Sequence, residues 1–333
     1  MTTKPIYIIA EMACAHDGDF EKAKKIIDAA VVAKADAVQL QFFVADHVVT
    51  PHHNVYDVLK KIEFNHQQWE ALFQYGKDKD IDVWACTYDT SSLALAVKLG
   101  VDGIKINSSD LSHPAILKGV CQAGIPFTLG TGASTMEEIV RAVQLIEQNG
   151  ALENVILMHG VQNFPTAIED LNIARIKLLQ NVFNLPVGYA DHTDASNPFA
   201  QTVDLLAVSH NIVLLEKHIT LDRAEKGIDY QAALEPLEWI DYVKRVRFAE
   251  KALGAPLLQP LTESDLNYRT FQKKSIVANK ALAAGVEIKK EDIIFIRNAE
   301  NGLSPSQVHK VIGKKVARAL EKFDNITEAD LSA

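Results

Sequence analysis

The stretch IYIIAEMACAHDGDFEKAKKIIDAAVVAKADAVQLQFF, residues 6–43, decides the fold of this chain. Residues 6–13 and 37–43 are short apolar runs rich in β-branched side chains, which is typical of buried strands. Between them, residues 20–35 repeat apolar side chains at helical spacing. A strand, a helix and a second strand in this order predict one βα unit of a parallel sheet.

The same rhythm continues well beyond this unit. Strand-like runs recur eight times, each followed by a helical pattern. Eight units over about 250 residues favour a closed (β/α)8 TIM barrel over an open doubly wound sheet, which commonly carries a glycine-rich nucleotide loop. Neither GxGxxG nor GxxxxGKS/T occurs in the chain. The predicted strands are residues 6–13, 37–43, 82–87, 103–107, 126–130, 155–159, 186–190 and 212–220, and the clearest helical patterns are residues 20–35, 67–79, 90–100, 135–148 and 237–253.

The chain is longer than one barrel needs, and its composition changes near residue 254. Ala-Pro-Leu-Leu-Gln-Pro-Leu and then polar residues follow, a composition typical of a linker. Beyond it, short strands are predicted at residues 275–278, 294–297 and 315–317, and a brief helix at residues 305–311. We therefore predict a catalytic barrel at residues 1–254, a linker at 255–272 and a small β-rich domain at 273–333 of the 333 residues.

The composition indicates a globular enzyme that acts on small molecules. Hydrophobic residues make up 48% and charged residues 23% of the chain, which suits a large buried core. The net charge of −9 argues against a nucleic-acid partner, because phosphate backbones are bound by basic surfaces. Three cysteines without CxxC spacing support neither a disulfide framework nor a zinc ribbon. Since no signal-like N-terminus and no apolar run of about 18 residues occurs, we expect a cytoplasmic protein without a membrane partner.

Polar residues collect where the predicted strands end. In a parallel barrel the active site lies at the carboxyl ends of the strands. An apolar lining would be the ordinary expectation there, so carboxylates, a lysine and several histidines are hard to explain as packing. These residues are Glu11, His16, Asp17, Gln39, Gln41, Thr87, Lys105, Asn107, Ser108, Ser109, Asp110, Thr131, His159, Gln162, Asn163, Asp191, His192, Glu216 and His218.

His192 and His218 follow the adjacent seventh and eighth strands. Both imidazoles could therefore reach one divalent ion that also takes water and a substrate oxygen. The alternative is that each is a buried histidine satisfied by its neighbours. Spacing alone leaves both interpretations open.

Three charged residues near the strand ends have alternatives of their own. Lys105, inside Gly-Ile-Lys-Ile-Asn, could hold an anionic substrate or form a Schiff base, or it could be a rim lysine. Glu11 lies among apolar residues and requires a partner or a substrate. Asp229 could bind sugar hydroxyls or be an ordinary turn residue. Lys217 alternates with His218 and is predicted to point outward, toward the helices.

Several motifs in this order resemble those of the sialic acid synthase family. They are Ile9-Ala10-Glu11, His16-Asp17-Gly18-Asp19, Lys105-Ile106-Asn107-Ser108-Ser109-Asp110, Asp191-His192-Thr193, Glu216-Lys217-His218-Ile219-Thr220 and Gly227-Ile228-Asp229. The tail, with Ser275-Ile276-Val277-Ala278 and Asn301-Gly302-Leu303-Ser304-Pro305, is similar to that family's antifreeze-like (SAF) domain. The resemblance covers essentially the whole chain.

The resemblance implies condensation of phosphoenolpyruvate with an N-acylated sugar aldehyde, giving a 2-keto-3-deoxy sugar acid and phosphate. It also implies a role for each matching residue. His192 and His218 would bind Mn²⁺ or Mg²⁺, and Glu11 and Asp110 match the family's active-site carboxylates. Lys105, Ser108 and Thr87 match positions that hold the enolpyruvyl anion, and Asp229 matches a ligand of the sugar hydroxyls.

The resemblance further implies a domain-swapped homodimer in which the tail caps the neighbouring barrel. Arg297 matches an arginine that the partner chain contributes to the sugar site. Phe271 matches an aromatic residue at the junction of the domains. A dimer with shared substrate sites is therefore expected.

The chain departs from the family pattern mainly around the anionic donor. Gln39 replaces a common second lysine, Gly130 and Ala190 each replace a serine, and Gln162 and Phe164 replace asparagine and tyrosine. We keep Gln39, Gln162 and Phe164 as substrate-binding positions. Because losing a cationic contact weakens the binding of a buried anion, two alternatives stay open. These are a metal-dependent aldolase that uses pyruvate and an aldose, and a related synthase with a different aldehyde acceptor.

Overall fold

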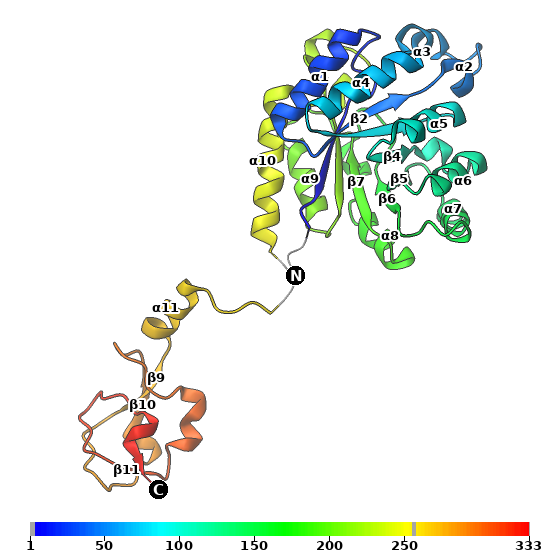
Figure 1. The fold of residues 1–333 in the computed structure, drawn as a ribbon. Helices are drawn as coiled ribbons and strands as arrows, with labels where there is room; N and C mark the ends of the chain where they lie inside the picture. Colours follow the sequence, from blue (N-terminus) through cyan, green and yellow to red (C-terminus); the bar gives the residue numbers. More distant parts are fainter. Residues whose placement is uncertain (1–3, 255–257, 333) are drawn as a thin grey trace. The chain divides into compact units, whose positions relative to one another are not determined.

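The computed structural model describes residues 4–254 and 258–332, and the chain divides into two compact units, Met1–Ala255 and Pro256–Ala333 (Figure 1). In the first unit, eight parallel strands follow one another around a closed barrel, and β1 completes the ring by pairing with β8. The predicted TIM barrel is therefore confirmed. The strands are β1 (Tyr7–Glu11), β2 (Ala37–Phe42), β3 (Asp82–Thr87), β4 (Gly103–Ile106), β5 (Phe127–Gly130), β6 (Val155–His159), β7 (Val187–Asp191) and β8 (Leu214–His218).

Helices surround the barrel, as Figure 1 shows. Local sequence fixes where they begin: Asp19, for example, accepts hydrogen bonds from the backbone N–H groups of Glu21 and Lys22 and so caps α1. Two short helices, α2 and α3, precede α4 in the connection from β2 to β3. The helices are α1 (Phe20–Ala33), α2 (Ala45–Val48), α3 (Tyr56–Ile62), α4 (His66–Asp78), α5 (Thr90–Leu99), α6 (Pro114–Ala123), α7 (Met136–Gln148), α8 (Arg175–Phe183), α9 (Ala200–Val208) and α10 (Pro236–Leu253).

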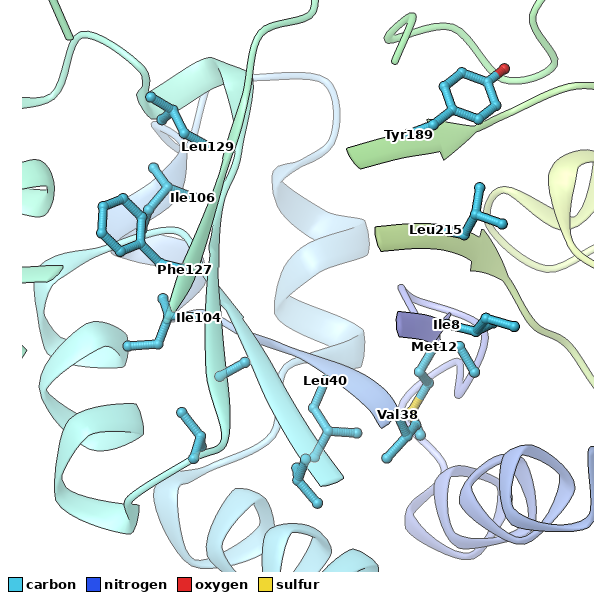
Figure 2. Packing of buried hydrophobic residues seen from close by; sticks show 14 of the residues in the cluster. Ile8, Met12, Val38, Leu40, Ile104, Ile106, Phe127, Leu129, Tyr189 and Leu215 are labelled. Atoms are coloured by element: carbon cyan, nitrogen blue, oxygen red, sulfur yellow. The ribbon is translucent and has the colours of Figure 1, made fainter. Parts of the chain in front are cut away.

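The largest part of the core lies between the strands and these helices. Figure 2 shows side chains of this layer, among them Ile8, Val38, Ile106 and Leu215, all of which are buried. Because side chains alternate along a strand, the next residue on each strand faces the barrel interior. The outward-facing residues of each strand therefore pack against the helices, while the inward-facing residues are available to contact a ligand.

The interior of the barrel is closed at the amino ends of the strands. Trp84 fills this end, where a Cβ added to Gly103 would come within 2.1 Å of the indole ring. Tyr7 lies next to it, with ring centroids 5.9 Å apart. Since this end is filled with side chains, the barrel can admit a ligand from the carboxyl ends of the strands, where the polar residues were predicted.

The second unit has its own small core, which includes Ile276, Leu282, Ile288 and Val316. Antiparallel pairs form between β9 (Ser275–Ala278) and β10 (Ile293–Ile296) and between β11 (Lys315–Val316) and β12 (Leu331–Ser332). A 3-10 helix, η6 (Pro305–Lys310), lies where a brief helix was expected. The β-rich tail domain is confirmed.

The beginning of the second unit contains a helix that the sequence did not predict. Helix α11 (Glu263–Gln272) occupies most of the proposed linker at residues 255–272. The predicted boundary at residue 254 adjoins residues 255–257, which lie outside the described residues, so the exact domain limits stay a prediction. Within the described ranges, no helix combines the length and apolar character that crossing a membrane requires.

Candidate active site

A cavity of about 300 Å³ lies at the carboxyl ends of the barrel strands. Six of the residues predicted for the site line it, which places them together as expected: Lys105, Gln162, Phe164, His192, His218 and Asp229. Gln41 and Asn107, which were recognised only as polar strand-end residues, also line the cavity. For the other lining residues no role was predicted: Cys14, Phe43, Val48, Leu59 and Tyr88.

The two histidines meet on one wall of this cavity, and the buried Glu216 lies next to them without lining the cavity. One donor atom of each of His192, Glu216 and His218 lies within 4.8 Å of the others, and all three residues are buried. The imidazole rings of His192 and His218 are edge to face, with centroids 5.2 Å apart. The ring of Phe164 packs against both imidazoles, and its centroid lies 4.3 Å from that of His192 and 5.5 Å from that of His218.

The protonation of these histidines suits metal binding. Burial lowers the pKa of His192, and burial together with the neighbouring His192 lowers the pKa of His218 well below its usual value. Nδ1 of His192 lies 2.7 Å from the carbonyl oxygen of Val161, to which a protonated Nδ1 donates, so that Nε2 stays available as a ligand. Two neutral imidazoles and a carboxylate are a donor set that fits a divalent ion.

Glu216 was recognised as a strand-end residue but not as a site residue. On β8 it lies two residues before His218, so alternation places both side chains on the inner face. That spacing was the signal that could have found it. Its Oε1 lies 2.5 Å from Nζ of Lys105, and its Oε2 accepts a hydrogen bond of 3.2 Å from Gln39.

A buried charge network extends from Glu216 beneath the cavity. Nζ of Lys105 lies 3.7 Å from Oε2 of Glu11, and Gln39 donates a hydrogen bond to the same carboxyl group. Burial opposes the charge of Lys105, but the carboxylates of Glu216 and Glu11 outweigh it and raise the lysine pKa. Burial raises the pKa of Glu11 to about 8, against the opposing effect of Lys105. The partner that Glu11 required is thus present within the chain.

Other predicted residues lie at the strand ends without lining the cavity. Thr87 is fully buried at the end of β3, and its hydroxyl has no hydrogen-bond partner among the described residues. Ser108 and Asp110 belong to the 3-10 helix η1 (Ser108–Asp110), where burial raises the pKa of Asp110. His159 is hydrogen-bonded to the carbonyl oxygen of Leu171, 2.8 Å away.

Two predicted residues belong to the second unit. Phe271 lies on α11 and is 58% exposed. Arg297 directly follows β10 and is exposed. Their proposed part in a neighbouring sugar site stays a prediction.

One side of the cavity is apolar and comes from the first third of the chain. Cys14 and Phe43 form a buried cluster with Ile62, against which Val48, Leu59 and Tyr88 pack. Among the residues that line the cavity, as far as the chain is described, Lys105 is the only lysine or arginine. The cavity therefore combines one paired cation, a wall with two histidines and an apolar wall.

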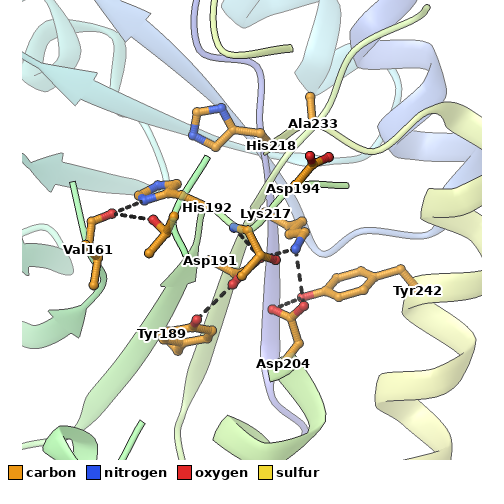
Figure 3. Close-up of polar contacts among 12 residues, drawn as sticks. Val161, Tyr189, Asp191, His192, Asp194, Asp204, Lys217, His218, Ala233 and Tyr242 are labelled. Atoms are coloured by element: carbon orange, nitrogen blue, oxygen red, sulfur yellow. Dashed lines mark hydrogen bonds and ion pairs between the residues drawn. The ribbon is translucent and has the colours of Figure 1, made fainter. Parts of the chain in front are cut away.

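Lys217 points away from the cavity, as alternation predicted. Its Nζ contacts Asp191 of β7 and lies 3.4 Å from Oδ2 of Asp204 on α9, as Figure 3 shows. Burial raises the pKa of Asp204 to about 7, whereas Lys217 outweighs burial and lowers the pKa of Asp191. These three groups form a polar cluster that is fully buried behind the histidines.

Two family models match the chain. The model of the NeuB family matches residues 26–257, and the model of the SAF domain matches residues 273–332.

Named relatives match over nearly their whole length. The N,N'-diacetyllegionaminic acid synthase of Legionella pneumophila is 29% identical, with 94% of this chain and 91% of that protein covered. The human N-acetylneuraminate-9-phosphate synthase is 28% identical, with 97% of this chain and 92% of that protein covered. A crystal structure of N-acetylneuraminic acid (sialic acid) synthetase from Leptospira borgpetersenii, in complex with citrate, has a TM-score of 0.74 and 29% identity, and the match covers 80% of this chain and 92% of that chain.

Proposed function

This chain belongs to the NeuB family, and on that premise we propose that it condenses phosphoenolpyruvate with an N-acylated sugar aldehyde to give a 2-keto-3-deoxy sugar acid and phosphate. The observation that carries the proposal is the buried set of His192, Glu216 and His218, whose histidines line the same cavity as Lys105 and whose carboxylate contacts that lysine. The activities named for the relatives, synthesis of N,N'-diacetyllegionaminic acid and of N-acetylneuraminic acid, support a product of the same class.

We assign Mn²⁺ or Mg²⁺ to the two histidines, with Glu216 as a third group beside them. Such an ion, when bound, acts as a Lewis acid on the aldehyde oxygen. One oxygen of Glu216 is held by Lys105 and the other by Gln39, so the carboxylate is oriented before any ligand arrives. The ring of Phe164 packs against the rings of both histidines and gives them an apolar neighbour.

The other residues of the site then act on the two substrates. Lys105, with Thr87, Ser108 and Gln39, is proposed to hold the enolpyruvyl anion while its enol carbon attacks the aldehyde carbon. Water adds to C2 of the resulting oxocarbenium ion, and the bond to phosphate breaks. Burial raises the pKa of Glu11 to about 8, so this group can exchange a proton near neutral pH during these steps. Asp110 is the second proposed carboxylate.

The lining of the cavity favours an uncharged, acylated acceptor. The apolar wall of Phe43, Val48, Leu59 and Tyr88 suits the methyl group of an acyl substituent. Because Lys105 is assigned to the donor, a phosphate on the acceptor would find no second lysine or arginine among the described lining residues. Asp229 and Gln162 are proposed to bind the sugar hydroxyls, and Arg297 and Phe271 to complete the sugar site from the partner in a domain-swapped homodimer.

A release assay tests the reaction. Metal-loaded protein should liberate inorganic phosphate from phosphoenolpyruvate only when an aldose is present, and an unphosphorylated N-acylated aldose should be preferred over its phosphorylated form. Incorporation of pyruvate without phosphate release would instead identify the aldolase alternative.

His218→Ala should reduce metal-dependent turnover by at least about 100-fold while circular dichroism and the melting temperature stay near wild type, because one metal ligand is lost. His66→Ala, at an exposed position at the start of α4, is the matched control and should keep full activity. Full activity of His218→Ala would remove the metal assignment.

A further inference from the structure

The last registered residue pair between β7 and β8 is Asp191 with Lys217. His192 directly follows β7, and His218 is the last residue of β8. Since side chains alternate, the charged pair points to the helices while the histidines point into the cavity (Figure 3). The ion pair is therefore the final side-chain link between the two strands before the proposed metal ligands.

This link is held from several directions. Tyr189 donates a hydrogen bond of 2.8 Å to Oδ1 of Asp191, and the Thr193 hydroxyl donates one of 2.7 Å to Oδ2. Asp204 of α9 lies on the other side of Lys217, and Tyr242 of α10 donates to Asp204 at 3.3 Å. The side chains that make these contacts are at most 1% exposed. One ammonium group thus joins β8 to β7 and to α9, and Tyr242 of α10 supports the α9 carboxylate.

We propose that Lys217, Asp191 and Asp204 are positioning residues that fix the separation of His192 and His218 and thereby set the affinity of the site for a divalent ion. The inference rests on the proposed metal site. Its physical basis is that charge-assisted hydrogen bonds are directional. An ammonium group between two carboxylates satisfies its hydrogen bonds in only one register of the two strands, whereas apolar contacts tolerate a small shift of one strand along the other.

The two histidines differ in how much they depend on this cluster. The ring of His192 is also held by the carbonyl oxygen of Val161. His218 is held instead through its backbone. Its carbonyl oxygen accepts a hydrogen bond of 3.1 Å from the indole N–H of Trp239 and one of 3.0 Å from the backbone N–H of Leu234. The position of His218 therefore follows the β8 backbone, which Lys217 attaches to β7.

The experiment measures Mn²⁺ binding to metal-free full-length protein by titration calorimetry. Lys217→Met should weaken Mn²⁺ binding about 10- to 100-fold, the usual effect of losing a group that orients metal ligands. Tyr189→Phe removes one hydrogen bond to Asp191 and should weaken binding by a smaller factor. The matched control is Tyr75→Phe, which removes a similar tyrosine–aspartate bond of 2.9 Å on α4 and should bind as wild type does.

A double variant separates positioning from stability. The double variant Asp191→Leu, Lys217→Met removes both charges of this ion pair, so Asp191 is not left as a buried carboxylate without its lysine. The melting temperature of the double variant should therefore be higher than that of Lys217→Met alone. If the cluster positions the histidines, Mn²⁺ affinity stays low in the double variant, and the visible spectrum of the Co²⁺ form stays shifted from wild type. Recovery of affinity together with stability would show a structural role only.

The outcomes also separate this inference from the proposed function. Wild-type protein that binds no Mn²⁺ would overturn the metal site and the inference with it. Wild-type binding that Lys217→Met and Tyr189→Phe leave unchanged would overturn the inference alone. If Lys217→Met does not fold, Tyr189→Phe and Asp204→Asn decide the matter by the same measurement.

Discussion

His16 is fully buried, and its surroundings disfavour the protonated form of the imidazole. Its ring stacks on Phe64 with centroids 4.5 Å apart, and Trp69 lies edge-on at 5.9 Å. Nδ1 accepts a hydrogen bond of 3.1 Å from the backbone N–H of Gly18, and Nε2 has no partner among the described residues. Burial lowers the pKa of His16 from 6.5 to about 4.

This shift predicts how stability depends on pH. The unfolded chain takes up the proton below about pH 6.5, whereas the folded protein does so only near pH 4, so stability is lost as the pH falls through this interval. The loss attributable to His16 is about 3 kcal/mol. In His16→Asn, whose amide oxygen can still accept from Gly18, the melting temperature should fall less steeply between pH 6.5 and 4 than in wild type.

The matched control for this prediction is His66→Asn, which changes an exposed histidine and should keep the wild-type slope. An unchanged slope in His16→Asn would mean that other groups carry the acid sensitivity.

For single residues, alternation along the strands predicted whether a side chain points into the barrel or toward the helices. It did not predict which other side chain each of them contacts. It placed Lys217 outside and His218 inside, because that choice depends only on neighbours along the strand. The partner of Lys105 was not predicted, since Glu216 is remote in sequence and is brought near only when β8 closes the barrel against β1.

Among the elements, the meeting of β5 with η1 explains one departure from the family pattern. Gly130 ends β5, and a Cβ added there would lie 2.7 Å from the backbone nitrogen of Ser108. The serine expected at this position would push the loop that carries Ser108 and Asp110. A glycine at residue 130 therefore lets this loop approach β5 closely.

Gly130→Ser should consequently lower the free energy of unfolding by about 1–3 kcal/mol, the usual effect of overpacking a buried position. Gly130→Ala should cost nearly as much, because both variants add the same Cβ. Denaturant unfolding measures the change, and turnover shows whether displacement of η1 disturbs the site. If both variants have the wild-type free energy of unfolding, the loop accommodates the added Cβ without a measurable loss of stability, and this prediction is wrong.

The elements themselves were predictable to different degrees. The limits of β3, β6 and β9 agree with the predicted strands, since their apolar runs end sharply. The run around β8 continues beyond the paired residues, so its predicted ends were too wide. Helix α11 was missed because none of its residues is buried, so the apolar stripe that reveals a helix is weak. The capping box of Thr262 and Asp265 was the available signal.

For the whole molecule, the separate cores of the two units allow a test of shared sites. His218→Ala should inactivate the site of its own barrel, and Arg297→Ala should inactivate the site that its tail completes. In a domain-swapped dimer, a mixed dimer of these two variants has one site with both residues intact. Unfolding and refolding the two together should therefore restore up to about a quarter of wild-type activity.

Each variant refolded alone is the control and should stay inactive. Light scattering on the mixture should give the mass of a dimer. A dimer of the two variants without any recovered activity would contradict the swapped arrangement.

The two walls of the cavity come from opposite ends of the barrel sequence. The apolar wall is built from residues between Cys14 and Tyr88, whereas the histidine wall is built from β7 and β8. A crossover between two related genes in the middle of the barrel would therefore exchange the apolar wall while His192, Glu216 and His218 stay together on one inherited segment. Such an exchange would change the apolar surface that the cavity offers to a ligand without separating the two histidines.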